Sequence, residues 1–147
     1  MEIITKKDNH LLFKELWCTF IKDNDVASHC DIEKIEYYLI TNAEYLVSDE
    51  SFVLTEDRRN CLAICFLPIY SKLEYNYLSG IAPISNKKKY LEKSFEYIDL
   101  VARSNDIAKI ELTIDICFSQ YGLWKHNYLR DYGYIDMSSN SHIFYLD

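Results

Sequence analysis

A change of hydrophobic period in the second half of the chain constrains the fold more than any other feature. Apolar residues first recur at steps of three and four, at Leu91, Phe95, Ile98, Val101 and Ala102. They then alternate with polar residues, at Ile110, Leu112, Ile114 and Ile116. The first spacing is typical of an amphipathic helix and the second of a strand with one apolar face. The pattern predicts a helix over residues 90–106 that covers a sheet, followed by a strand of that sheet.

The segment Tyr75–Ala82 precedes this helix and has the composition of another strand. Two strands joined by a helix through short connections run parallel, and the crossover is right-handed. The connection at residues 84–89 carries three successive lysines, Lys87, Lys88 and Lys89. These lysines either bind an anion at the helix N-terminus or form a solvated helix start.

Size and charge limit the classes of function. The chain has 147 residues and a mass of 17.5 kDa, which predicts a single domain over residues 1–147. Hydrophobic residues make up 49% and charged residues 27%, as in a globular protein. The net charge of −7 argues against nucleic acid as the main ligand, because binding phosphates needs a basic surface.

No apolar run approaches the roughly 20 residues of a membrane helix, and the segment MEIITKKDNH lacks the apolar centre of a signal peptide. We therefore expect no membrane association and a cytoplasmic location. The chain has five cysteines, of which Cys61 and Cys65 lie four residues apart in an expected strand. Partners at zinc spacing are missing, so buried thiols, no disulfide and no metal site are expected.

Further elements follow from local patterns. A strand is expected over Met1–Lys6, and a helix begins near Asn9, with Asn9 or Asp8 as its cap. A hairpin is expected at residues 51–56 and 61–70 with a turn at 57–60, and helices are expected at 31–40 and 118–132. Gly133 is well placed to end the last helix, and two strand-like pieces around 138–141 form a closing hairpin.

Residues 81–114, IAPISNKKKYLEKSFEYIDLVARSNDIAKIELTI, resemble the centre of the GNAT superfamily of acyl-CoA-dependent N-acyltransferases. The later YLRDYGYID is similar to the end of that superfamily's last helix and its following strand. The resemblance implies an α/β fold: a mixed, mostly antiparallel sheet with a central splayed parallel strand pair and helices on both faces. It also implies acetyl-CoA as acyl donor, with its phosphates at the helix N-terminus.

The family loop has glycines that let the backbone approach the pyrophosphate, whereas residues 86–91 contain none. A lysine run holds phosphates by charge and does not reproduce that backbone cradle. The cofactor-binding residues that the resemblance implies are Ile81, Ala82, Asn86, Lys87, Lys88, Lys89 and Asn127.

Direct acyl transfer needs an oxyanion donor, a base and an acid. By resemblance, the donor is a backbone N–H near Gly80–Ala82. Glu111, on the polar side of the second strand of the parallel pair, is the first candidate for the base, followed by Glu74 and then Asp115. Each carboxylate has an alternative as an exposed group or, with Lys109, as an ion pair.

The family's acid is a tyrosine about four residues before the glycine-aromatic pair. That register falls on Leu129, one residue after Tyr128, and one residue is about 100° around a helix. Tyr128 is the candidate for protonation of the thiolate, with Tyr121 as runner-up. With 13 tyrosines in the chain, a core or surface role is the alternative for both.

The predicted activity is transfer of an acyl group from coenzyme A to a primary amine on a small molecule or peptide. The main alternative is a non-catalytic GNAT-like binding or regulatory module, with a homodimer as one open arrangement. The tail YIDMSSNSHIFYLD also resembles the Fem-type branch of aminoacyl transferases, whose members contain two GNAT-like domains. The acidic charge and the length of one domain disfavour that third reading.

Overall fold

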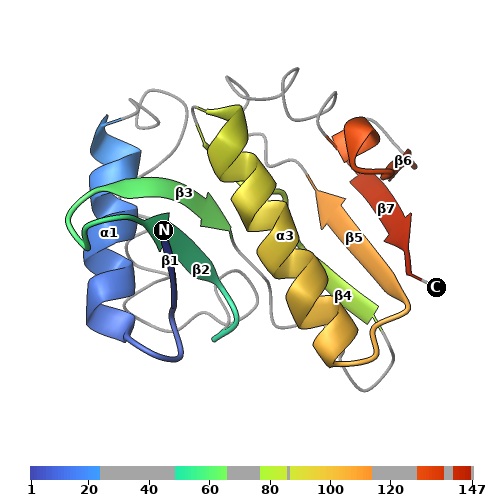
Figure 1. Ribbon diagram of the computed structural model, residues 1–147, viewed down its shortest axis with the longest axis horizontal. Coiled ribbons are helices and arrows are strands. Elements are labelled where there is room, and N and C mark those ends of the chain that lie inside the picture. The colour runs from blue at the N-terminus through green and yellow to red at the C-terminus, as the bar shows by residue number, and fades with distance from the viewer. Residues whose placement is uncertain (24–48, 66–76, 86, 114–128, 138–140, 147) are drawn as a thin grey trace.

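The computed structural model describes residues 1–23, 49–65, 77–85, 87–113, 129–137 and 141–146, which are coloured in Figure 1. The elements, in chain order, are β1 (Glu2–Thr5), α1 (His10–Asp23), β2 (Phe52–Thr55), β3 (Cys61–Cys65), β4 (Tyr77–Ile81), α3 (Lys88–Ser104), β5 (Lys109–Thr113), β6 (Ile135–Asp136) and β7 (Ser141–Tyr145). Their order agrees with the predicted one.

The described strands form two sheets. One has the order β1-β2-β3, with antiparallel pairs throughout, and the other has the order β4-β5-β7-β6. The backbones of Ile64 in β3 and Ile84 after β4 exchange two hydrogen bonds of 3.0 and 2.8 Å. This isolated bridge joins the two sheets, and residues 66–76 between β3 and β4 lie outside the described residues.

The predicted parallel pair is β4 and β5. Their register runs from Tyr77 opposite Lys109 to Ile81 opposite Thr113. Because α3 connects them, the strand–helix–strand crossover is confirmed. The other pairs in the second sheet, β5–β7 and β6–β7, are antiparallel. The predicted splaying concerns the residues after Thr113, which lie outside the described residues.

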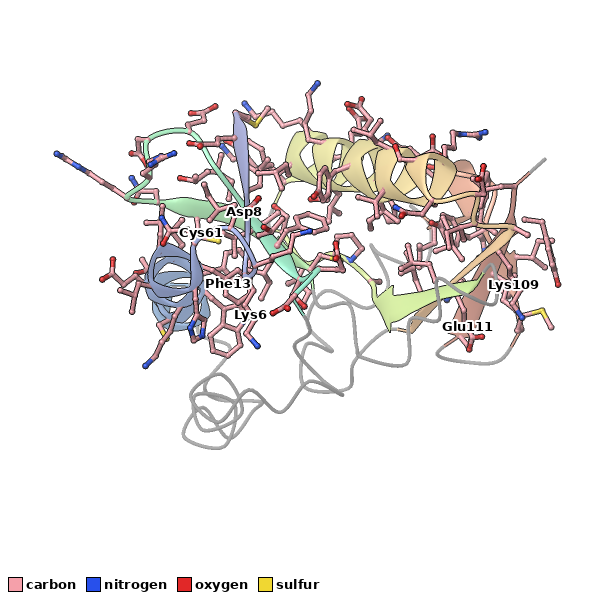
Figure 2. All side chains as sticks on the ribbon, turned by 90° about the horizontal axis from the view of Figure 1, so that it is seen from below. Lys6, Asp8, Phe13, Cys61, Lys109 and Glu111 are labelled. Atoms are coloured by element: carbon pink, nitrogen blue, oxygen red, sulfur yellow. The ribbon has the colours of Figure 1, made fainter. Side chains whose placement is uncertain are left out.

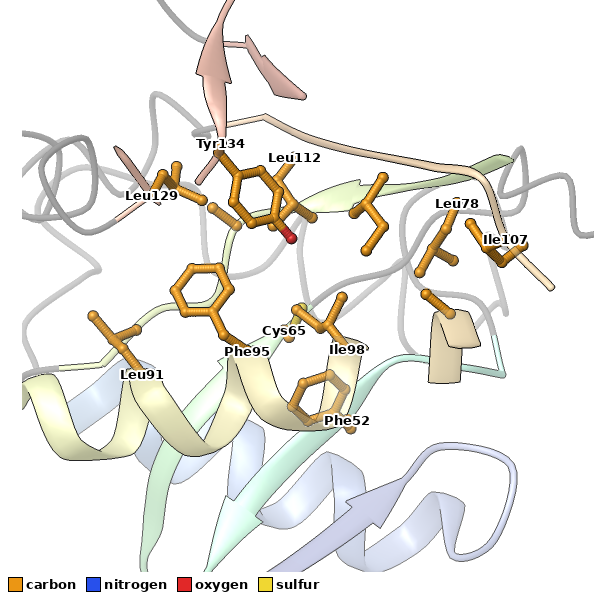
Figure 3. Packing of buried hydrophobic residues seen from close by; sticks show 13 residues of the cluster. Phe52, Cys65, Leu78, Leu91, Phe95, Ile98, Ile107, Leu112, Leu129 and Tyr134 are labelled. Atoms are coloured by element: carbon orange, nitrogen blue, oxygen red, sulfur yellow. The ribbon is translucent and has the colours of Figure 1, made fainter. Parts of the chain in front are cut away.

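Helices α1 and α3 cover opposite faces of the strand layer, as Figure 2 shows. Four of the five members of the apolar stripe predicted for α3, Leu91, Phe95, Ile98 and Ala102, are at most 5% exposed, and the fifth, Val101, is half-buried. Figure 3 shows this stripe packed against Phe52 of β2 and the second sheet. Burial of a large apolar side chain contributes about 1.5–3 kcal/mol to the free energy of unfolding. Packing on α3 therefore stabilises both sheets.

The two described long helices begin differently. In α1, the backbone N–H of Leu12 donates to Oδ1 of Asn9 over 3.1 Å, which confirms Asn9 as the cap. In α3, the capping residue is Lys87, and its side chain makes no capping hydrogen bond. Helix α3 therefore begins two residues before the predicted start, and Lys88 and Lys89 belong to its first turn rather than to a loop.

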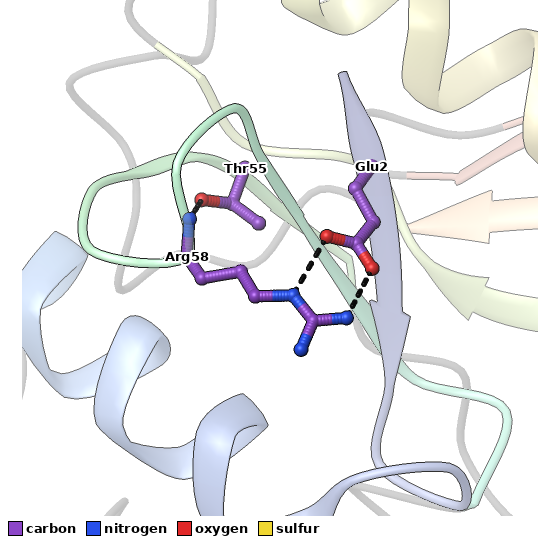
Figure 4. A network of polar contacts seen from close by, with 3 residues as sticks. All are labelled: Glu2, Thr55 and Arg58. Atoms are coloured by element: carbon purple, nitrogen blue, oxygen red, sulfur yellow. Dashed lines mark hydrogen bonds and ion pairs between the residues drawn. The ribbon is translucent and has the colours of Figure 1, made fainter.

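The turn between β2 and β3 is held by a network of polar contacts. The Thr55 hydroxyl accepts from the backbone N–H of Arg58 over 3.0 Å and donates to the carbonyl of Asn60 over 2.7 Å. The Arg58 guanidinium reaches back to the Glu2 carboxylate of β1 through bonds of 2.9 and 2.7 Å (Figure 4). Arg58 has φ 61°, so the turn includes one left-handed residue. These contacts join the tip of the hairpin to the edge strand.

The last helix ends at Gly133 as predicted. The N–H of Gly133 donates to the carbonyl of Arg130, and the N–H of Tyr134 donates to the carbonyl of Leu129, each over 2.9 Å. With φ 90° at Gly133, this is a Schellman motif. The closing hairpin of β6 and β7 is also confirmed.

The predicted helix at 31–40 and the strand residues after Cys65 lie outside the described residues, as does most of the predicted helix at 118–132. Among the described residues, no helix is long and apolar enough to span a membrane.

Candidate functional site

The lysine cluster Lys87–Lys89 lies where α3 begins, six residues after the end of β4. All three side chains are exposed, whereas Ala82, Ile84 and Ser85 in the connection are buried. Buried residues thus tie the connection into the core, and the three lysine side chains extend outward.

Ser85 fixes the geometry of this connection. Its hydroxyl donates to the carbonyl of Leu62 over 2.6 Å and accepts from the backbone N–H of Lys87 over 3.3 Å. The side chain is fully buried, so these contacts are shielded from water. Ser85 was not among the predicted site residues, although a serine two residues before a helix cap is a recognisable local signal.

The electrostatics of the helix start favour an anion. The N-terminus of a helix carries about half a positive charge from its aligned peptide dipoles. Carboxylates normally lie there, yet the first turn of α3 has none and Lys87–Lys89 add three cations. Because like charges repel, this arrangement costs stability in the free protein, and a bound anion removes that cost.

Tyr90 orients two of the three lysines. The Lys87 ammonium lies 5.9 Å and the Lys89 ammonium 5.0 Å from the centre of its ring. The ring is only 8% exposed, and it packs with Leu54 and Ala63 of the first sheet. Cation–π attraction of about 0.5–1 kcal/mol at such partly exposed positions holds the ammonium groups near the helix start.

Glu111, the first candidate for the base, is half-buried on β5. Its Oε1 accepts a hydrogen bond of 3.0 Å from the Ser141 hydroxyl of β7. Its neighbours in the strand, Ile110 and Leu112, are buried on the other face, which confirms the predicted alternation. Ser141 is 30 residues away in the sequence, and the predicted alternative, an ion pair of Glu111 with Lys109, stays a prediction.

No protein-family model matches the sequence, and no curated protein sequence is similar enough to count as a relative. Solved structures do match over the whole chain. A GNAT-family acetyltransferase from Staphylococcus aureus Mu50 superimposes with a TM-score of 0.68 at 14% identity, covering 99% of each chain. The chain has the GNAT fold. Tetrahymena GCN5 matches with a TM-score of 0.56 at 9% identity, covering 99% of this chain and 95% of its own.

A further match with the GNAT fold is the PaiA N-acetyltransferase of Thermoplasma acidophilum, whose structure is a complex with coenzyme A. It superimposes with a TM-score of 0.55 at 13% identity and covers 99% of this chain and 100% of its own. The fold-level resemblance predicted from residues 81–114 is therefore confirmed. The Fem-type resemblance stays a prediction.

Several of the candidate residues in this GNAT fold lie outside the described residues. They are Glu74, Asn86, Asp115, Tyr121, Asn127 and Tyr128. The predicted roles of these residues in catalysis and cofactor binding stay predictions. Ile81 is the last residue of β4 and Ala82 follows it, so their backbone lies at the strand end where the oxyanion donor was predicted.

The cysteines of β3 behave as structural thiols. Cys65 is fully buried, and burial raises the pKa of its thiol far above the ordinary value. Burial likewise raises the pKa of the Cys61 thiol, which donates to the carbonyl of Ala63 over 3.3 Å. Raised pKa values remove the thiolate that nucleophilic chemistry requires. No three His, Cys, Asp or Glu side chains within the described part of the chain are grouped so that they could hold a metal ion.

A polar cluster at the C-terminal hairpin was not predicted. His142 of β7 is fully buried, and its Nε2 lies 3.0 Å from Oδ1 of Asp136 in β6. The guanidinium of Arg130 pairs with the other oxygen of the same carboxylate. Cross-strand pairing places Asp136 opposite His142, a contact that depends on a hairpin register the sequence does not reveal. The cluster ties the last helix to the strand that carries Ser141.

Proposed function

We propose that the protein is an N-acyltransferase that takes an acetyl or other acyl group from coenzyme A and transfers it to a primary amine. The observation that carries this proposal is the exposed lysine cluster at the N-terminus of α3. In this GNAT fold, β4, the first strand of the parallel pair, leads into α3 at that place. The coenzyme A complex of PaiA, which has the same fold at 13% identity, supports the choice of donor.

The residues at this helix start fit a pyrophosphate by charge. The positive end of the helix dipole favours an anion at this place. The backbone N–H groups of Lys87 and Tyr90 donate to the Ser85 hydroxyl and to the Lys87 carbonyl, so the lysine charges and the dipole supply the attraction. Lys87–Lys89 supply three positive charges there, and Ser85 together with Tyr90 holds the segment in place. Without glycine, the backbone keeps a greater distance from the phosphates, so lysine side chains carry more of the binding here.

The proposed reaction forms a bond between the amine nitrogen and the acyl carbon and breaks the bond from that carbon to sulfur. Glu111, held by Ser141, accepts the proton that the amine loses, directly or through water. A backbone N–H near Gly80–Ala82 stabilises the developing negative charge on the acyl oxygen. Tyr128 donates a proton to the departing thiolate of coenzyme A.

Calorimetric titration with acetyl-CoA and with coenzyme A tests the binding step. Changing Lys87, Lys88 and Lys89 together to glutamine should weaken binding about 5- to 150-fold, since three exposed ion pairs contribute about 1–3 kcal/mol in total. The matched control changes Lys7, Lys14 and Lys93 to glutamine, which alters the net charge equally at other places. Binding by the parent protein should also weaken as salt is raised.

Equal losses in the two triple variants would contradict binding at the helix start. Absence of binding to the parent protein at millimolar ligand would favour the second candidate, a GNAT-like binding or regulatory module without acyl transfer. Two observations favour that candidate. The loop lacks glycine, and the Lys87 and Lys89 ammonium groups already contact the Tyr90 ring.

A further inference from the structure

A hollow of about 250 Å³ lies between α3 and the C-terminal hairpin, away from the lysine cluster. The described residues that line it are Phe95, Glu96, Asp99, Tyr132, Tyr134 and Phe144. The α3 residues of the lining come seven to eleven positions after Lys88, which is about 10–16 Å along the helix. The hollow is thus separate from the proposed coenzyme A site.

Four aromatic rings form most of its wall. The rings of Phe95 and Tyr132 stack with their centres 4.8 Å apart, and Phe95 lies 5.8 Å from Tyr134. Tyr134 in turn lies 5.2 Å from Phe144. Figure 3 shows the Tyr134 ring facing Phe95 across the space between α3 and the C-terminal segment. The rings are tilted by 28–51° relative to their neighbours, so the wall is curved rather than a flat stack.

Gly133 makes this arrangement possible. Its left-handed conformation reverses the chain between Tyr132 and Tyr134, so both rings come to the same hollow. A Cβ at this position would lie 3.2 Å from the Phe144 ring, which means that glycine also permits the close approach of β7. The backbone turn and the ring cluster therefore depend on the same residue.

Two carboxylates on α3 lie at the hollow, each beside one cation of the same helix. Glu96 and Asp99 line it, and their partners Lys93 and Arg103 lie at 3.3 and 2.9 Å on the same helix. All four side chains are well exposed, and such pairs hold a side chain only weakly. Both carboxylates are therefore available to a ligand. Burial raises the pKa of the Tyr134 hydroxyl, so this ring stays neutral.

This lining selects for a cation with an apolar surface. Aromatic ring faces attract a positive charge and also contact methyl or methylene groups, whereas an anion is repelled by the rings and by the carboxylates. A volume just below the 300–1,000 Å³ of ordinary ligand sites suits a head group rather than a whole nucleotide. We propose that the hollow binds an alkylated ammonium group, with the half-buried Tyr132 and Phe144 rings against its alkyl carbons and Glu96 and Asp99 as counter-charges.

The proposal does not rest on acyl transfer, and it holds equally for a catalytic and a non-catalytic protein. Its test compares choline with 3,3-dimethylbutan-1-ol, a neutral alcohol of the same shape. Each is titrated into the isotope-labelled full chain, and backbone amide shifts are followed by NMR. Choline should cause saturable shifts at Phe95, Asp99, Tyr134 and Phe144. The neutral alcohol should bind at least about tenfold more weakly, because it lacks the charge.

Two variants separate the contributions of charge and rings. Changing Glu96 to glutamine and Asp99 to asparagine together should weaken choline binding about tenfold and leave the alcohol unaffected. Asp106→Asn, which removes one exposed carboxylate beyond the far end of α3, compared with two in the double variant, is the control for net charge and should leave choline binding unchanged. Phe144→Leu keeps an apolar side chain but removes one ring, and it should weaken choline more than the alcohol.

Equal affinities for choline and the alcohol would overturn the proposal, as would shifts confined to other parts of the molecule or no saturable shift with choline at all. An equal loss in the Asp106→Asn control would attribute the effect to net charge and would overturn it as well. The substituted carboxylates are exposed, so the fold should be retained. Spectra of the variants without ligand check this.

Discussion

Replacement of Gly133 by alanine tests the account of the C-terminal turn. The residue has φ 90°, and a left-handed conformation costs an L-residue about 1–2 kcal/mol. The new Cβ would also lie 3.2 Å from Cε2 of Phe144 and displace that ring slightly. Alanine restricts the unfolded chain, which returns about 0.4–1 kcal/mol. The net expectation is a loss of about 1 kcal/mol in the free energy of unfolding.

Urea unfolding followed by far-UV circular dichroism measures this loss, which corresponds to a fall of about 2–4 °C in Tm for a chain of this size. Gly133→Asn is the matched control, because asparagine tolerates left-handed backbone and should be less destabilising than alanine. In a Phe144→Leu background the ring contact is absent, so Gly133→Ala should lower the free energy of unfolding only by the cost of the strained backbone. An alanine variant as stable as the parent would show that neither the strain nor the contact exists in solution.

Three further predictions concern separate parts of the chain. Hydrogen bonds from the backbone N–H groups of Asn60 and Arg59 lower the pKa of Asp57 from 3.8 to about 2. The hairpin should therefore lose stability as the pH falls through that interval. Asp57→Ala should remove this component from acid-unfolding curves. The Cys65 thiol, whose pKa is raised by burial, should react with a thiol-specific reagent at pH 8 only after denaturant is added. Rapid labelling of Cys65 itself in the native protein, located by peptide mapping, would contradict its burial. If Glu111 is the base, Ser141→Ala should lower kcat with little change in KM for acetyl-CoA, and Ser141→Thr should keep the parent kcat. An unchanged kcat in Ser141→Ala would exclude a positioning role for Ser141.

The parts of the fold that follow from local periodicity were predictable. The change of period between Phe95 and Leu112 predicted both α3 and β5, because burial of an apolar face dictates where side chains can lie. Asn9 and Gly133 were identified as helix ends because a capping side chain and a left-handed glycine are local requirements. The start of α3 was placed two residues late because its cap, Lys87, carries no recognisable capping side chain.

What the sequence did not predict depends on contacts between distant segments. Ser141 meets Glu111 only because β5 and β7 pair in one particular register, and strand register across 30 residues leaves no trace in a single sequence. The pair of Asp136 with His142 has the same origin. The aromatic hollow was likewise hidden, since it combines a helix residue, Phe95, with two tyrosines flanking a glycine. An aromatic on each side of Gly133 was the one available signal.

An NMR titration of the full chain with coenzyme A shows whether the phosphates bind at the N-terminus of α3 through Lys87–Lys89. The account predicts saturable shifts that are largest at the amides of residues 87–91 and extend to the end of β4, and that weaken with added salt. No shift at millimolar coenzyme A, or saturable shifts that leave residues 87–91 unaffected, would contradict it.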